Sequence, residues 1–143
     1  MFLVNHCLRI IKECSPQFWV LENPATGRLK EFLGKPEMSY EPWQFGSPWT
    51  KRTALWGDFN KPELLYTKWR DVPKNENLYV QPTRTKPSLA KLHKSAKQYI
   101  KEFESFEVKD DAGFRSLCSQ GFAKSFFNAN NPLGYKAVIQ EDK

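Results

Sequence analysis

Hydrophobic positions near the start of the chain recur every three or four residues, which is the spacing of one helix face. The pattern predicts an amphipathic helix over residues 2–13. Ser15-Pro16 ends this helix, because proline cannot continue it. The predicted apolar face consists of Leu3, Val4, Cys7, Leu8 and Ile11.

A continuous apolar run follows, from Phe18 to Leu21. A short run without alternation is typical of a strand buried on both faces, as in parallel sheets. A helix, a short break and a buried strand in succession favour an α/β fold. Residues 28–33 predict one further helical turn, ended by Gly34 and Pro36.

A second strand is predicted over residues 53–59, TALWGDF, where Gly57 suggests a bulge. The segment before it, residues 36–50, holds three prolines and four aromatic residues, which indicates an ordered loop. Residues 60–87 are rich in Pro, Asn and Lys and predict an irregular excursion.

The last third of the chain predicts two helices separated by a break at residues 110–113. The first spans residues 89–103, with a strongly basic outer face and an apolar stripe that includes Leu89, Leu92 and Phe103. The second spans residues 120–130, with Phe122, Phe126 and Phe127 facing inward. The whole chain, residues 1–143, is expected to form a single domain with an irregular basic segment over residues 60–112.

Composition narrows the classes of protein that fit this pattern. The 143 residues are 40% hydrophobic and 15% aromatic, which suits a folded chain with one modest core. Three cysteines without metal-site or redox-motif spacing predict reduced thiols and a cytoplasmic protein. No apolar stretch approaches the ~20 residues of a membrane span, and the first residues, MFLVNHC, do not resemble a signal peptide.

The net charge of +6 is concentrated in the middle of the chain. Residues 51–101 carry twelve Lys/Arg and four Asp/Glu, whereas residues 1–50 are balanced and residues 102–143 are slightly acidic. Such a segment is either a solvated basic face or a surface that contacts phosphates. The charge alone does not separate these two interpretations.

Three blocks of sequence resemble the C-terminal half of phage-type DNA cytosine-5 methyltransferases. They are WVLENPATGRLKEFLGKP (19–36), YEPWQFGSPWTKRTALWGDFNKP (40–62) and FRSLCSQGFAKSFFNANNP (114–132). Their order and spacing also agree with that family. The third block departs most, because relatives tend to have Thr-Pro where this chain has Cys118-Ser119. The resemblance implies a partial Rossmann-like methyltransferase fold, with a small sheet flanked by helices.

The resemblance implies a role for the acid that ends the first strand. Glu22 matches the family's Glu-Asn motif, in which the acid binds the N3 edge of a cytosine flipped out of the helix. Such an acid needs burial to raise its pKa towards neutrality. Asn23 would hold the loop and Pro24 would fix the turn. Spacing alone favours a simpler role, in which Glu22 caps the turn that follows.

Basic residues complete the expected site. Arg52, the third catalytic candidate after Glu22 and Asn23, matches a family residue that reaches the base or a nearby phosphate. This role is favoured over the alternative, a solvent-facing charge pair at the start of a strand. Arg115 contacts phosphate or caps a carbonyl group. The expected DNA-binding residues are Lys51, Arg52, Lys91, Lys94, Lys97 and Arg115.

Two parts of a complete methyltransferase are not found in the sequence. There is no glycine-rich turn for S-adenosylmethionine, and no cysteine after a proline ahead of Glu22 to serve as the nucleophile. Cys7 and Cys14 lie on or at the end of a predicted helix, so neither replaces it. No cofactor or metal site is therefore expected in this chain alone. S-adenosylmethionine binding would require a separate N-terminal half.

Three hypotheses follow from these observations. The chain is a truncated or split methyltransferase half that is inactive alone, a basic nucleic-acid-binding protein, or a partner-binding fragment such as a homodimer. The expected partners are DNA and either a second copy or a separate N-terminal half.

Overall fold

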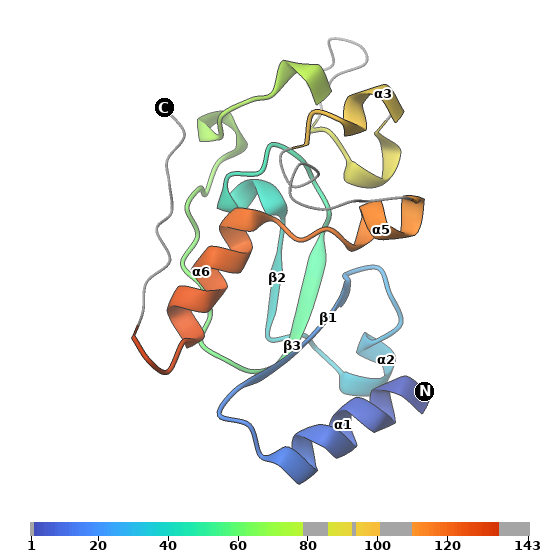
Figure 1. The fold of residues 1–143 in the computed structure, drawn as a ribbon, viewed down its shortest axis with the longest axis vertical. Coiled ribbons are helices and arrows are strands. Elements are labelled where there is room, and N and C mark those ends of the chain that lie inside the picture. The colour runs from blue at the N-terminus through green and yellow to red at the C-terminus, as the bar shows by residue number, and fades with distance from the viewer. Residues whose placement is uncertain (1, 79–85, 93, 101–109, 135–143) are drawn as a thin grey trace.

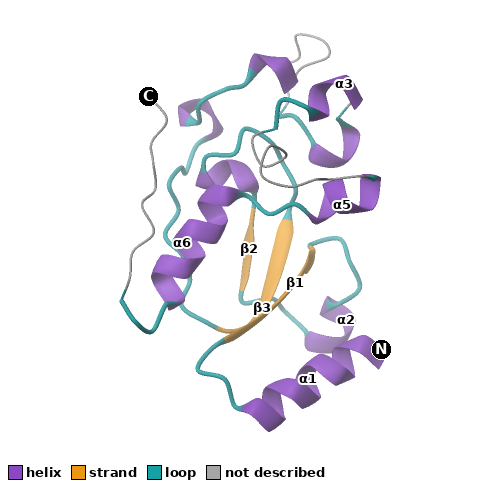
Figure 2. Cartoon of the chain, viewed as in Figure 1, coloured by secondary structure: helices purple, strands orange, loops and turns teal. Residues whose placement is uncertain are grey.

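The computed structural model describes residues 2–78, 86–92, 94–100 and 110–134. Within these residues, helices surround a small sheet of three antiparallel strands (Figure 1; Figure 2). The strands are β1 (Trp19–Pro24), β2 (Met38–Tyr40) and β3 (Thr53–Asp58), and they lie in the order β1-β3-β2. The chain therefore has a mixed α/β architecture, as the sequence predicts.

The direction of the strands differs from the prediction of a parallel sheet. β3 pairs antiparallel with both neighbours, so that Leu55 lies between Glu22 of β1 and Met38 of β2. The first strand is also longer than the apolar run that predicts it, since it continues through Glu22 to Pro24. None of its residues is fully buried. The uninterrupted apolar run was misleading because β1 lies at an edge of the sheet.

Side chains of the central strand alternate between the two faces of the sheet. Leu55 belongs to a cluster with Tyr40, Phe45 and Phe122 on one face. Ala54 and Trp56 belong to a cluster with Leu29 on the other face, together with partly buried Val4 and Leu33. Helix α6 (Gln120–Asn130) covers the first face, and α1 (Phe2–Cys14) and α2 (Lys30–Leu33) contribute to the second.

Both N-terminal helices confirm the predicted periodicity. Gly34 follows α2 with a φ of 72°, a conformation that favours glycine at the end of a helix. The carbonyl oxygen of Gly34 also accepts a hydrogen bond of 2.9 Å from the indole nitrogen of Trp56. The end of α2 is thereby fixed to the central strand.

The aromatic loop of residues 36–50 contains a strand and a 3₁₀ helix that the sequence pattern did not predict. After β2, the helix η1 (Pro42–Phe45) begins with a reciprocal capping box between Glu41 and Gln44. Gly46 ends it with a φ of 93°. The loop is ordered, as predicted, because these caps satisfy its backbone groups.

The predicted bulge at Gly57 is not present, since Gly57 pairs in regular register with Val20. Glycine is nevertheless required here for two reasons. Its φ is 150°, and a Cβ atom at this position would overlap the carbonyl oxygen of Trp19. Gly57 therefore allows β1 and β3 to approach closely.

The basic segment does not form the long helix predicted over residues 89–103. Its described part forms a 3₁₀ turn, η4 (Leu89–Lys91), and a short helix, α3 (Lys94–Lys97); residues 101–103 lie outside the described residues. The amide of Leu89 donates a 3.0 Å hydrogen bond to the carbonyl oxygen of Thr50. The helix is not continuous, because Leu92 at the end of η4 has an extended backbone with a φ of −64° and a ψ of 135°.

Residues 60–78 are irregular, as predicted, apart from two short 3₁₀ helices, η2 (Trp69–Asp71) and η3 (Glu76–Leu78). Leu78 of η3 packs with apolar residues from the loop before β3, from residues 86–100 and from the segment after α5. This third core cluster contains Trp49, Leu78, Leu89, Ile100 and Leu117.

Helix α5 (Asp111–Ser116) begins inside the predicted break at residues 110–113, so that part of the prediction is wrong. The Asp110 carboxylate accepts a 2.7 Å hydrogen bond from the Gly113 amide, as a residue that starts a helix does. Helix α6 matches its predicted bounds and is capped by the Ser119 hydroxyl, which accepts from the Phe122 amide. Phe127 is 46% exposed, so it does not face inward as predicted.

Asn60 and Asn130 fasten the end of α6 to the chain that leaves β3. The Asn130 side-chain oxygen accepts a 2.7 Å hydrogen bond from the Asn60 amide, and its nitrogen donates to the Asn60 carbonyl oxygen at 2.9 Å. The side chain of Asn60 in turn donates to the carbonyl oxygen of Ala129 at 3.0 Å. We call this pair the asparagine clamp.

Candidate functional site

A cavity of about 230 Å³ lies between the sheet and α6. Both strands that flank β3 contribute side chains to it, as do the start of β3 and the segment that joins α5 to α6. The lining residues are Val20, Glu22, Tyr40, Lys51, Leu55, Ser116, Cys118, Phe122 and Phe126. The wall is mainly apolar and aromatic, with a few polar groups, which is the usual composition of a binding site for a small molecule.

Glu22 reaches this cavity because of the strand's two-residue period. Val20 and Glu22 point to the face that α6 covers, whereas Leu21 packs on the opposite face. The side chain of Glu22 is exposed, so it lies at the mouth of the cavity. The proton-donor role that the resemblance implies requires a desolvated acid, and the side chain of Glu22 lacks that burial. Carboxylate oxygens accept hydrogen bonds.

Tyr40 and Phe122 form the aromatic wall. Their rings are stacked, with centroids 3.9 Å apart and planes inclined by 9°. Burial raises the pKa of the Tyr40 phenol far above its usual value, and the neighbouring Cys118 and Glu22 raise it further. Tyr40 is therefore protonated at neutral pH.

Lys51 ties the start of β3 to the segment between α5 and α6. Its ammonium group donates a 3.0 Å hydrogen bond to the carbonyl oxygen of Leu117. Its backbone amide donates a 3.1 Å hydrogen bond to the Glu41 carboxylate. The cavity thus contains a carboxylate, Glu22, and an ammonium group, Lys51, that reach it from different elements.

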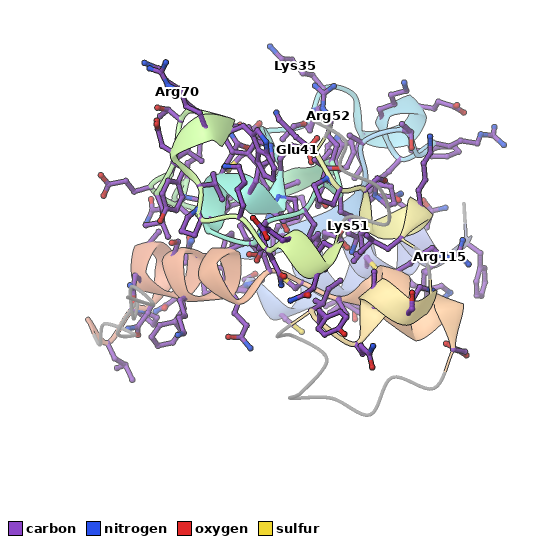
Figure 3. All side chains as sticks on the ribbon, turned by 90° about the horizontal axis from the view of Figure 1, so that it is seen from above. Lys35, Glu41, Lys51, Arg52, Arg70 and Arg115 are labelled. Atoms are coloured by element: carbon purple, nitrogen blue, oxygen red, sulfur yellow. The ribbon has the colours of Figure 1, made fainter. Side chains whose placement is uncertain are left out.

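Glu41 lies beside this site and has an altered acidity. Burial raises the pKa of its carboxyl group, while the Lys51 amide, Lys86 and Arg52 act in the opposite direction. Figure 3 shows Arg52 next to Glu41, with Lys51 nearby. Arg52 does not line the cavity. It is exposed on the side of the molecule from which Lys35 and Arg70 also extend (Figure 3).

Asn23 does not face the cavity either. It lies on the other side of β1, paired with Ala54. A Cβ atom built on Gly27 would lie 2.8 Å from its side-chain oxygen, so Asn23 packs against the turn that follows Pro24. The expected role of holding the loop through backbone hydrogen bonds stays a prediction.

Lys91, Lys97 and Arg115 are not among the residues that line the cavity in the described part of the chain. Lys91 lies in η4, and Lys94 and Lys97 lie in α3, so the three do not share a continuous helix face. Arg115 is exposed on α5, away from Lys35 and Arg70 in the view of Figure 3. Of the predicted site residues whose side chains the structure describes, only Glu22 and Lys51 line the cavity.

Sequence reasoning missed Tyr40, Cys118 and Phe126 as lining residues. The sequence signal for Tyr40 is the alternation of apolar and polar residues at Met38, Ser39 and Tyr40. Three residues are too few to predict a strand within a segment that contains three prolines. Cys118 had a different signal, since it is where the third block departs from the resembling family. Its thiol lies on the cavity wall and is exposed.

Among the described residues, there is no group of three or more His, Cys, Asp or Glu side chains that could hold a metal ion. The same residues include no helix with the length and apolar character needed to cross a bilayer. No family model, curated protein or solved structure matches this chain.

Proposed function

We propose that this protein binds DNA and holds an unpaired cytosine in the cavity, as the base-recognition half of a cytosine-5 methyltransferase that is inactive alone. The observation that carries the proposal is the presence of Glu22 at the mouth of an aromatic cavity of about 230 Å³. A base that enters such a pocket must leave the helical stack, and base-flipping proteins receive it between aromatic or apolar side chains.

The chemistry of the cavity suits cytosine. The exocyclic amino group of cytosine is a hydrogen-bond donor, and a carboxylate is its natural acceptor. Glu22 supplies that acceptor, while Tyr40 and Phe122 supply an apolar wall. The ammonium group of Lys51 adds a donor for the carbonyl oxygen of the base or for a phosphate.

The proposal assigns recognition rather than methyl transfer to this chain. S-adenosylmethionine and the nucleophile would come from a separate N-terminal half, and the small sheet would be a shortened, rearranged counterpart of the Rossmann-like methyltransferase sheet. We also propose a cytoplasmic location, which is supported by the free thiols of Cys7, Cys14 and Cys118.

Discrimination between two unpaired bases tests this function. Thymine presents an acceptor where cytosine presents its amino group, so a duplex with one unpaired cytosine should bind more tightly than one with an unpaired thymine. The expected preference is about 1 kcal/mol or more. Glu22→Ala should abolish it, whereas Glu63→Ala, which removes an exposed carboxylate outside the cavity lining, should preserve it.

Equal affinity of the wild-type protein for the two duplexes would contradict the proposal. So would a cytosine preference that survives Glu22→Ala, because the carboxylate would then not be the group that reads the base. Fluorescence anisotropy with labelled duplexes measures both quantities.

A second candidate function, partner binding through α1, has its own observation. None of residues 2–14 is buried, and Phe2, Leu3 and Ile10 are 80%, 75% and 52% exposed. Such an apolar surface is typical of an interface. We propose a second copy of this chain as its occupant, with a separate N-terminal half as the alternative.

Sedimentation over a wide concentration range tests the second candidate. The wild-type chain should dimerise, and Leu3→Lys with Ile10→Lys should give a monomer that melts at nearly the same temperature. A wild-type chain that stays monomeric throughout excludes the homodimer. Association that occurs only when a separate N-terminal half is added would favour the alternative.

A further inference from the structure

Two tryptophans outside the cavity meet at a right angle. The rings of Trp43 in η1 and Trp69 in η2 have centroids 6.2 Å apart and planes inclined by 84°. The ammonium group of Lys86 lies 4.4 Å from the Trp43 centroid and 5.8 Å from that of Trp69. Trp43 is buried, whereas Trp69 remains partly exposed and Lys86 is exposed.

The turn that carries Trp69 is held by a second lysine. The ammonium group of Lys74 lies 4.4 Å from the Trp69 centroid and donates hydrogen bonds to the carbonyl oxygens of Trp69 and Val72. These contacts fix the indole in one orientation. A fixed aromatic ring loses little conformational entropy when a ligand stacks on it.

The surroundings of Trp69 are positively charged. Four cationic side chains, all exposed, lie in the same turn or over the ring, and the one acidic residue of η2, Asp71, pairs with Arg70 at 3.6 Å. We call this set the tryptophan patch, which consists of Lys68, Trp69, Arg70, Lys74 and Lys86. An excess of positive charge attracts phosphates and repels free cations.

The tryptophan patch adjoins the site described above. Lys86 lies over Trp43, which follows Glu41 in the chain by two residues, and Glu41 accepts the amide hydrogen of Lys51. Lys51 lines the cavity. These contacts link the tryptophan patch to the cavity through Glu41 and Lys51. Figure 3 shows Arg70 and Arg52 extending from the same side of the molecule.

We propose that the tryptophan patch binds single-stranded nucleic acid, with a base stacked on Trp69 and the adjacent phosphates on its lysines. The proposal rests on the proposed function, since the bound strand would flank the base in the cavity. Indole faces accept any base, and ammonium groups follow the backbone, so such sites bind with little sequence preference. Lys86, which is exposed, leaves the ring and moves onto a phosphate when the base stacks.

A thymidine-only oligonucleotide of about 12 nucleotides tests the patch separately from the cavity, because it contains no amino group for Glu22. Trp69→Ala should weaken its binding about tenfold, and Trp69→Phe should retain most of the affinity. Lys86→Glu, which keeps both tryptophans, should weaken binding and reduce the slope of log affinity against log salt by about 0.7 or more. Phe32→Ala, which removes an exposed aromatic side chain on α2, should have no effect.

The result that overturns the inference is unchanged oligonucleotide affinity in both Trp69→Ala and Lys86→Glu. If the cytosine preference and its loss in Glu22→Ala persist in that case, only the patch is wrong and the proposed function stands. Conversely, a patch effect without any cytosine preference removes the cavity function and leaves a general single-strand binder. A change in tryptophan fluorescence on adding tetramethylammonium, but not on adding the oligonucleotide, would also overturn the inference. The tryptophan patch would then be a site for cations.

Discussion

Gly121 shows how one residue sets the contact between α6 and η1. A Cβ atom at this position would overlap the carbonyl oxygen of Phe45, so the helix can approach η1 only because the side chain is a hydrogen atom. Close approach of this kind brings Phe122 onto Phe45 and Tyr40. The aromatic wall of the cavity therefore depends on a glycine that makes no polar contact itself.

Gly121→Ala is expected to destabilise the protein, although alanine is the better helix former by about 1 kcal/mol. Overpacking against the Phe45 carbonyl group should outweigh that gain and give a net loss of about 1 kcal/mol or more. Ala123→Gly on the exposed side of the same helix provides the control, with an expected loss of about 1 kcal/mol. If helix propensity alone governed α6, urea denaturation would show a higher free energy of unfolding for Gly121→Ala and a lower one for Ala123→Gly.

Glu41 should make stability depend on pH. Because burial raises its pKa in the folded state, the folded protein binds a proton that the unfolded chain has already lost. The free energy of unfolding should therefore fall as pH rises from the usual value of 4.5 through the raised pKa of Glu41. Glu41→Gln, which keeps an oxygen acceptor for the Lys51 amide, should remove this decrease.

The measurement is a series of thermal melts between about pH 4 and pH 7, a range that spans the usual acidity of carboxyl groups. Glu63→Gln, an exposed position, should leave the wild-type profile unchanged. A Glu41→Gln profile that follows the wild type would show that other groups control the pH dependence.

At the scale of elements, the asparagine clamp fixes where α6 ends. Asn130 is buried and its side chain bonds both backbone groups of Asn60 as well as the carbonyl oxygen of Phe126. Asn130→Ala should cost about 1–3 kcal/mol, because these groups lose their partners. Asn60→Ala should cost less, because it removes only the exposed bond to Ala129 and keeps the backbone groups that Asn130 binds. Equal losses for the two variants in urea denaturation would contradict this assignment.

Elements with strong local periodicity could be predicted from the sequence, and elements fixed by distant contacts could not. Helices α1 and α6 follow from the spacing of their own apolar residues. Residues 89–103 have equally good helical spacing, but the chain is anchored to Thr50 through the Leu89 amide and its backbone is extended at Leu92. Antiparallel pairing was also hidden, since the apolar run at Phe18–Leu21 carries no alternation.

The candidate site was predictable to the same extent. Glu22 and Lys51 could be found because each stands within a short motif at the end or start of a strand. Tyr40 and Cys118 could not, because they are far apart in the sequence and meet only when α6 packs on the sheet. The expected burial of Glu22 failed for a related reason, since β1 is an edge strand with one flank uncovered.

At the scale of the whole molecule, the chain alone should not bind S-adenosylmethionine. Its sequence contains no strand followed by a glycine-rich turn, which is the element that receives the cofactor in the resembling family. Titration calorimetry should show no heat of binding at micromolar concentrations. The same preparation should bind the thymidine-only oligonucleotide, which establishes that the protein is folded. Micromolar affinity for S-adenosylmethionine would contradict this prediction and the assignment of recognition alone.

The exposure of α1 has a consequence for the motions of the native state. Since none of residues 2–14 is buried, the helix can unwind while the sheet and α6 keep their packing. Its amide hydrogens should exchange with deuterium far faster than those of β3, whose Thr53, Ala54, Leu55 and Trp56 are buried and exchange only when the whole molecule opens. A partner seated on α1 would slow the exchange of that helix selectively, so the isotope pattern would reveal the partner's footprint before its identity is known.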